Sequence, residues 1–190
     1  ETAIASLCDY LDEHRLEDFV LVGHSYGGMI ITAIADRLAA RVRRLVYWNA
    51  FVPHDGQALV DLVPAHYAEM FESLVAADGG ISLPFPVWRD AFINDAPLAL
   101  ATSAYRELNP HPWASFTEPL RLARPPAAFS MPRSYLNCTE DIALPYSHGW
   151  HPRLSEKLGL FRLVQCSGSH ELCFTNPTLL GQKIMEAGRD

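Results

Sequence analysis

The sequence lacks the features of three large classes of protein. No apolar run approaches the roughly 20 residues that a membrane-spanning helix needs. No basic run is present to bind phosphates, and the net charge is −7, with 15 Lys and Arg against 22 Asp and Glu. The four cysteines show no CxxC spacing, so neither a zinc site nor a disulfide scaffold is indicated. We therefore expect reduced cysteines, a cytoplasmic location, and neither a membrane nor a nucleic acid as partner.

The amino terminus lacks both an initiator methionine and a recognisable signal peptide. The chain opens with Glu1, and from Thr2 onward its apolar residues already follow helical spacing. A first residue other than methionine predicts processing or truncation of a longer chain.

What is present is typical of a globular enzyme. Hydrophobic residues make up 49% of the 190 residues and charged residues 19%, which suffices for one domain with a sizeable core. Short apolar runs typical of buried parallel strands lie at 19–22, 45–48, 134–138 and 161–166. Helical patterns lie at 2–17, 29–41, 148–158 and from 177 onward. This alternation predicts an α/β fold with a parallel sheet and right-handed crossovers.

The region from 53 to 132 interrupts the alternation. Prolines recur through it, which argues against strands. It also carries many large aromatic side chains, which a disordered linker would not. We interpret residues 53–132 as an inserted cap of short helices and loops, and residues 1–52 and 133–190 as the core domain.

The clearest functional motif is Gly23-His24-Ser25-Tyr26-Gly27-Gly28, set between a predicted buried strand and a helix. It fits the G-x-S-x-G nucleophile elbow, in which a strained turn exposes the serine. The glycines let strand and helix approach closely. The Tyr26 N–H at the helix start is then the expected donor to an oxyanion. The alternative is a glycine-rich turn without chemistry.

A serine nucleophile needs a base that is held by a third group. In this fold the acid and then the histidine follow later strands. His170 comes just after the last predicted strand, while Glu140 and Asp141 both follow the preceding one. We favour Asp141, since this fold more often uses Asp. Some relatives place the acid after the second predicted strand, but Asn49 occupies that position and has no carboxylate.

The other histidines give weaker patterns. His148 and His151 are spaced as a metal pair, but no third ligand is evident nearby, so an exposed helical face is the simpler interpretation. His111 in the cap could contact the substrate, but a packed loop is the simpler interpretation. His54 is best explained by a turn, and His24 by packing or a local hydrogen bond. We expect neither a metal nor a cofactor.

Four segments together resemble bacterial esterases of the α/β-hydrolase superfamily that are related to plant methylesterases and hydroxynitrile lyases. These segments are 20–29, 44–53, 134–141, and 168–171 with Asn176-Pro177. The resemblance implies Ser25, Asp141 and His170 as a catalytic triad, because the family's acid is the last residue before a turn like that from Ile142 to Pro145.

The sequence departs from the family at three places. Asn49 stands where members usually carry Asp. Glu171 stands where the hydroxynitrile lyases have a lysine, directly after the catalytic histidine. The family also begins with strands and a His-Gly loop that supplies a second oxyanion donor, and no such segment is present here.

The sequence thus predicts a serine carboxylesterase that cleaves a small, largely apolar ester through an acyl-enzyme. The alternatives are a lyase or C–C bond hydrolase on the same triad, or a hydrolase-fold binding protein without turnover. Because the fold has about eight strands and four are predicted here, we expect a missing amino-terminal part of some 50–80 residues, judged from usual βα-unit lengths. It would cover the first strand either as a further segment of the same polypeptide or as a second chain, and a homodimer is the alternative.

Overall fold

A computed structural model describes residues 1–190, and its centre is a four-stranded parallel sheet in the order β1-β2-β5-β6. The strands are β1 (Phe19–Ser25), β2 (Val42–Ala50), β5 (Arg133–Cys138) and β6 (Arg162–Cys166). All three pairings are parallel. The four predicted strands and their direction are therefore confirmed. β1 pairs only with β2 and forms one edge of the sheet.

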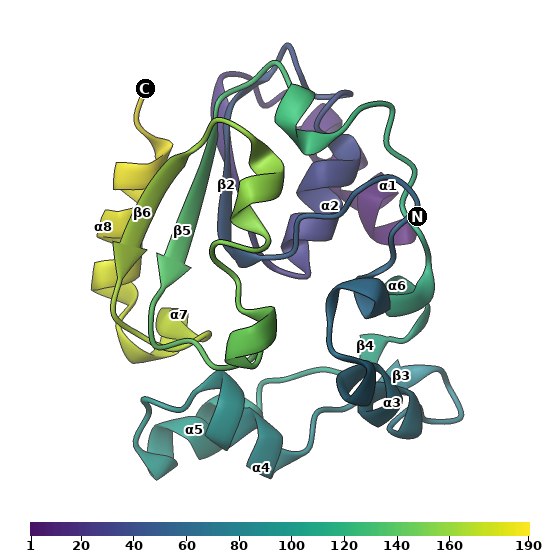
Figure 1. Ribbon diagram of the computed structural model, residues 1–190, viewed down its shortest axis with the longest axis vertical. Helices are drawn as coiled ribbons and strands as arrows, with labels where there is room; N and C mark the ends of the chain where they lie inside the picture. The colour runs from purple at the N-terminus through teal and green to yellow at the C-terminus, as the bar shows by residue number, and fades with distance from the viewer.

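Helices cover both faces of the sheet (Figure 1). Helices α1 (Thr2–Glu13) and α2 (Gly27–Ile34) lie on one face, and α8 (Pro177–Gly188) lies on the other. Alternate residues of β2 point to opposite faces, as in any strand: Tyr47 packs in the cluster with α1 and α2, and Trp48 in the cluster with α8. The sheet is buried on both sides, which explains why its strands read as continuous apolar runs.

Most of residues 53–132 form short elements beyond the carboxyl ends of the strands, whereas the segment just before β5 lies at the amino end of that strand (Figure 1). The elements are η1 (Leu59–Leu62), α3 (Ala65–Ser73), β3 (Gly80–Ile81), α4 (Phe85–Val87), η2 (Trp88–Phe92), α5 (Leu98–Tyr105), β4 (His111–Pro112), α6 (Ala114–Thr117) and η3 (Pro126–Ala128). A small apolar cluster of its own, built around Trp88 and Ile93, supports the middle of this region. The prediction of a strand-free cap is wrong in one detail, since β3 and β4 pair as a two-residue antiparallel ribbon. A ribbon this short leaves no periodicity to detect.

The predicted helix at 148–158 is also wrong. Two short 3₁₀ turns, η4 (Tyr146–His148) and η5 (Ser155–Leu158), occupy the region instead. Pro152 lies between them, and a proline inside a helix removes a hydrogen bond and clashes with the preceding turn. Two further helices end before their predicted limits: α1 stops at Glu13 and α2 at Ile34, and turns follow α2 up to residue 41.

The remaining element, α7 (Leu172–Thr175), directly precedes α8. Asn176 caps α8 by accepting a hydrogen bond from the Leu179 N–H at 3.1 Å, and Pro177 occupies the first turn. Both features match the predicted start of the last helix. None of the helices is long and apolar enough to cross a membrane.

Candidate active site

Ser25 lies at the end of β1, on the turn into α2, with a φ angle of 51°. Few residues other than glycine adopt this left-handed conformation, and such strain is common at functional sites. The backbone around this turn is also closely packed. A Cβ atom on Gly28 would lie 2.2 Å from the Phe51 carbonyl oxygen, and one on Gly23 would lie 2.8 Å from that of Gly27. The structure therefore has the geometry that the elbow motif predicts.

Tyr26 is the residue at the start of α2, and its backbone N–H donates no hydrogen bond within the chain. A free N–H at a helix start is suited to bind a developing negative charge. The tyrosine ring packs edge-on against His111 of the cap, with ring centroids 4.8 Å apart. The predicted oxyanion donor thus stands free beside Ser25.

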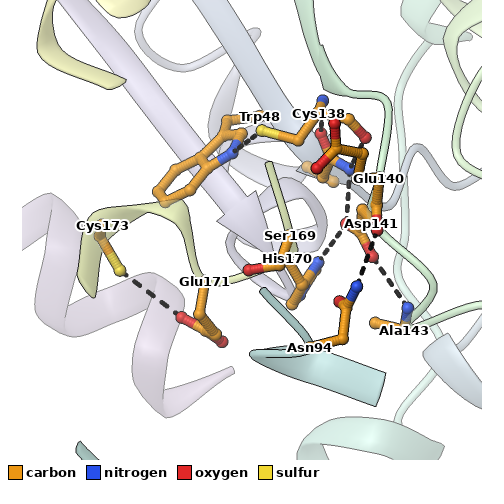
Figure 2. A network of polar contacts seen from close by, with 12 residues as sticks. Trp48, Asn94, Cys138, Glu140, Asp141, Ala143, Ser169, His170, Glu171 and Cys173 are labelled. Carbon is orange, nitrogen blue, oxygen red and sulfur yellow. Dashed lines mark hydrogen bonds and ion pairs between the residues drawn. The ribbon is translucent and has the colours of Figure 1, made fainter. Parts of the chain in front are cut away.

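The structure brings Asp141 and His170 together. Nδ1 of His170 lies 2.6 Å from Oδ2 of Asp141, and both side chains are buried, with exposed fractions of 1% and 0% (Figure 2). The Ala143 N–H donates to the other Asp141 oxygen, Oδ1, at 2.9 Å. Glu140, the other candidate acid, is exposed to solvent. Of the two carboxylates, only that of Asp141 bonds to the histidine.

The negative charge of Asp141 affects the pKa of His170. Burial by itself would lower the pKa of His170, but the charge and hydrogen bond of Asp141, together with the charge of Glu171, raise it above its ordinary value. The imidazole ring also stacks on Trp150, with centroids 5.0 Å apart and planes 14° apart. The charged form of the imidazole is therefore stabilised and the ring is held in place.

The cap fixes the loop that carries His170. The Ser169 N–H donates to Oδ2 of Asp95 at 3.1 Å, and the Glu171 N–H donates to the Phe92 carbonyl at 3.1 Å. Phe92 in turn packs edge-on against the His170 ring, with centroids 5.4 Å apart. The cap thus determines the position of the histidine as well as covering the site.

Two cavities meet at Ser25. The larger, of about 350 Å³, lies under the cap and is lined by Ser25, Tyr26 and Glu171 among others. The smaller, of about 70 Å³, is almost wholly apolar and is lined by Ser25, Tyr26 and His170, with Phe51 and Trp150 in its wall. Ser25 and His170 therefore border the same cavity, although their side chains are not hydrogen-bonded to each other.

One group near the site resembles a metal-ligand set. A ring nitrogen of His24, a ring nitrogen of His170 and a carboxylate oxygen of Glu171 all lie within 4.8 Å of one another. Nδ1 of His170 is hydrogen-bonded to Asp141, so a metal ion would have to bind Nε2. Nε2 is the only ring nitrogen left to serve as a base, so metal binding would compete with that role. His148 and His151, which are spaced like a metal pair in the sequence, bond to neighbouring serines.

His24 packs as predicted, stacked on Trp48 with ring centroids 3.9 Å apart. Burial, and then the charge of His170, lower its pKa well below the ordinary value, so the ring stays neutral. Its Nε2 atom has no hydrogen-bond partner.

The model of the alpha/beta hydrolase family matches residues 1–179. The protein belongs to this family. The predicted fold and the predicted family resemblance are both confirmed.

Three relatives illustrate the likeness. The carbendazim hydrolyzing esterase of Nocardioides sp. (strain SG-4G) is 50% identical over 64 residues, which cover 34% of this chain but only 26% of that protein. The second relative is an extracellular α/β-hydrolase from a Paenibacillus species, which is described as sharing structural and functional homology with tobacco salicylic acid binding protein 2. Its structure superposes with a TM-score of 0.94 at 38% identity, covering 98% of this chain and 78% of that one.

The Arabidopsis methylesterase MES16 shows the same fold, with a TM-score of 0.69 at 22% identity over 90% of this chain and 70% of that one. The Nocardioides and Paenibacillus proteins are named an esterase and a hydrolase, which supports the predicted class of enzyme. Since the Paenibacillus protein is described as extracellular, the expected cytoplasmic location of this chain stays a prediction.

Two side chains of the site lie outside the predicted triad and oxyanion donor. Asn49 bonds to Asp141, and Glu171 faces the larger cavity. The sequence did mark both positions as departures from the family pattern. No local pattern indicated their contacts.

Proposed function

We propose that the protein is a serine carboxylesterase in which Ser25 is the nucleophile, His170 the general base and Asp141 the acid that orients it. The observation that carries this proposal is the buried 2.6 Å contact between His170 Nδ1 and Asp141 Oδ2, in a cavity that Ser25 also lines. This contact leaves Nε2 of His170 as the ring nitrogen that takes the serine proton.

The reaction proceeds in two halves. Ser25 Oγ attacks the ester carbonyl carbon while His170 accepts its proton, and the Tyr26 N–H stabilises the oxyanion. The bond to the alcohol oxygen then breaks, and His170 returns the proton to that oxygen as the alcohol leaves. Water repeats the sequence on the acyl-enzyme and releases the acid. Asp141 stays ionised and holds the imidazole in the required tautomer.

The two cavities support an orientation for the substrate. His170 must protonate the departing alcohol, so the alcohol has to lie on the His170 side of Ser25. Of the two cavities, only the apolar one of about 70 Å³ is lined by His170. It accommodates only a few heavy atoms, because a water molecule takes up about 30 Å³. A short alcohol therefore occupies this space, and the acyl group occupies the larger cavity.

Covalent labelling tests the mechanism. A fluorophosphonate probe should label Ser25 in the native protein and leave Ser25→Ala unlabelled. Ser25→Ala should also lose ester turnover by several orders of magnitude, because residues of a triad act as a unit, while its melting temperature stays close to that of the native protein. Absence of labelling would favour a binding protein without turnover. Labelling without ester hydrolysis would favour a lyase or C–C bond hydrolase.

A series of esters tests the orientation. With the acyl group held constant, kcat/KM should fall steeply as the alcohol is lengthened from methyl to butyl and benzyl. A rate that instead falls as the acyl group grows, with no dependence on the alcohol, would reverse the assignment of the two cavities.

A further inference from the structure

Glu171 is the one acidic side chain in the wall of the larger cavity. It follows His170 directly in the chain. Figure 2 shows its side chain on the opposite side of His170 from Asp141, outside the Asp141 network. The acyl half of the substrate, which the proposed function places in this cavity, therefore lies against a carboxylate.

The protein provides few hydrogen bonds to this carboxylate. Its only hydrogen bond comes from the Cys173 thiol to Oε2, with sulfur and oxygen 3.5 Å apart, and no group of the protein bonds to Oε1. A thiol is a weak donor. Burial raises the pKa of Glu171, which means that the surroundings disfavour its anion, and the opposing charge of His170 does not cancel this effect.

Rotation of the Glu171 side chain cannot easily bring Oε1 to a hydrogen-bond donor of the protein. The Glu171 backbone is anchored by its bond to the Phe92 carbonyl, and Ser169, on the other side of His170 in the chain, is anchored to Asp95. The polar neighbours in the cavity wall are largely engaged elsewhere. The Tyr105 hydroxyl donates to the Leu83 carbonyl at 2.7 Å, and Nε2 of His111 bonds to the Ser115 hydroxyl at 2.6 Å. A molecule that enters the cavity can therefore supply the donor that these neighbouring side chains do not.

We propose that Glu171 selects the acyl group of the substrate: it binds an ammonium or N–H group on that half of the ester and rejects a carboxylate there. An incoming cation gains a charge-assisted hydrogen bond to a carboxylate whose anion is disfavoured by burial. An incoming carboxylate meets a like charge, and the repulsion is stronger at a partly buried group than in bulk water. This inference rests on the proposed function only in assigning the acyl group to the larger cavity.

Three esters of matched shape test the selection. They are methyl benzoates that carry a methyl, an aminomethyl or a carboxylate group at the meta position. For the native enzyme, kcat/KM should be highest for the aminomethyl ester and lowest for the carboxylate ester. Glu171→Gln should reduce the ratio of aminomethyl to methyl ester by about 10- to 100-fold, the range expected for loss of a charged hydrogen bond. Any effect of the substitution on His170 is common to all three esters and cancels in the ratio.

Two further variants serve as controls. Glu140→Gln removes the same charge from an exposed position that lines neither cavity, so it should leave the ratio unchanged. Glu171→Asp keeps the charge and should retain part of the selectivity. Equal kcat/KM values for the three esters in the native enzyme, or the same ratio in Glu171→Gln, would overturn the inference and leave the esterase proposal standing.

Binding measurements distinguish the esterase proposal from the proposed selection by Glu171. Affinities of the three esters for Ser25→Ala, measured by calorimetry, should show the same preference, and Ser25→Ala with Glu171→Gln should lose it. If the native protein hydrolyses none of the esters but Ser25→Ala shows this preference, the esterase proposal fails and the selection by Glu171 stands. If Ser25→Ala binds the three esters equally or binds none of them, the selection by Glu171 is wrong.

Discussion

Asn49 donates a hydrogen bond from Nδ2 to Oδ2 of Asp141, the same oxygen that bonds to His170. Asn49 is fully buried at the end of β2 and has a positive φ angle of 36°. Its Oδ1 accepts from the Cys138 N–H at 2.6 Å, and its Nδ2 also reaches the Cys138 carbonyl at 3.3 Å. The side chain therefore ties the end of β2 to the end of β5 and orients the carboxylate of Asp141.

Replacing Asn49 by Asp should make stability depend on pH. An ionised carboxylate cannot donate to Asp141, and two buried carboxylates in contact cannot both ionise, so the pKa of one is raised. A carboxyl group with a raised pKa in the folded state destabilises the fold little at a pH below its pKa in the unfolded chain, because it is protonated in both states there. The loss of stability grows as the pH rises above that value. We expect the melting temperature of Asn49→Asp to fall further below the native value at pH 8 than at pH 5.

The loss should reach about 1–3 kcal/mol at pH 8, the range for a buried polar group without a partner. Asn94→Asp makes the same chemical change at an exposed position and should show no such trend. An equal loss at both pH values would show that Asn49 does not act on Asp141 in this way.

Asp141 and Glu140 should differ sharply when each is converted to its amide. Asp141→Asn should reduce kcat by roughly 10³–10⁴, because the amide favours the wrong histidine tautomer. Glu140→Gln should cost far less, because its side chain lies in solvent. Steady-state ester hydrolysis measures both, and similar losses would mean that the acid has been misassigned.

Gly27 and Gly28 offer a matched test of the elbow. Gly28→Ala would push a methyl group into the Phe51 backbone, whereas a Cβ on Gly27 would meet nothing within 4 Å. We expect Gly28→Ala to destabilise the fold by at least about 1–3 kcal/mol. Gly27→Ala should be stabilising by about 0.5–1 kcal/mol, because alanine favours the helix. Chemical denaturation of both variants would show the difference, and equal stabilities would contradict the packing described for β1 and α2.

The pH profile should reflect the charges around His170. The imidazole must be neutral to accept a proton, so kcat/KM falls as pH decreases through its pKa. Asp141 and Glu171 raise this pKa above the ordinary 6.5, and His24 stays neutral and adds no charge. We therefore expect the acid limb above pH 6.5. Glu171→Gln removes one negative charge and should move the limb to lower pH, while Glu140→Gln should not. A limb well below pH 6.5 in the native enzyme would refute this.

The parts of the fold that the sequence predicted are those with a local pattern. Buried parallel strands are short apolar runs, and the four strands accordingly lie where expected. The helix expected at 148–158 was wrong because Pro152 breaks a stretch whose apolar spacing otherwise suits a helix. The β3–β4 ribbon pairs residues about 30 positions apart, and only the folded cap brings them together.

The same distinction holds for the site. Ser25, Asp141 and His170 could be predicted because each stands in a recognisable motif or directly after a strand. The contacts of Asn49 and Glu171 could not, because the direction of each side chain is set by packing between distant segments. Glu171, for example, is turned toward the cavity in a loop that is bonded to Phe92 of the cap.

The last prediction concerns reaction type, and it depends on the charge of Glu171. In the hydroxynitrile lyases that the sequence resembles, a lysine follows the catalytic histidine, and its positive charge stabilises the departing cyanide. Here a carboxylate holds that position, within 4.8 Å of a His170 ring nitrogen. A negative charge beside a departing anion raises the free energy of that anion, strongly so where little water screens it. We expect ester hydrolysis without useful cleavage of mandelonitrile. Glu171→Lys should raise cyanide release relative to ester turnover, while Glu140→Lys, with the same change of charge in solvent, should not. Cyanide release by the native protein at a rate comparable to ester turnover would show that the sign of this charge does not decide the reaction.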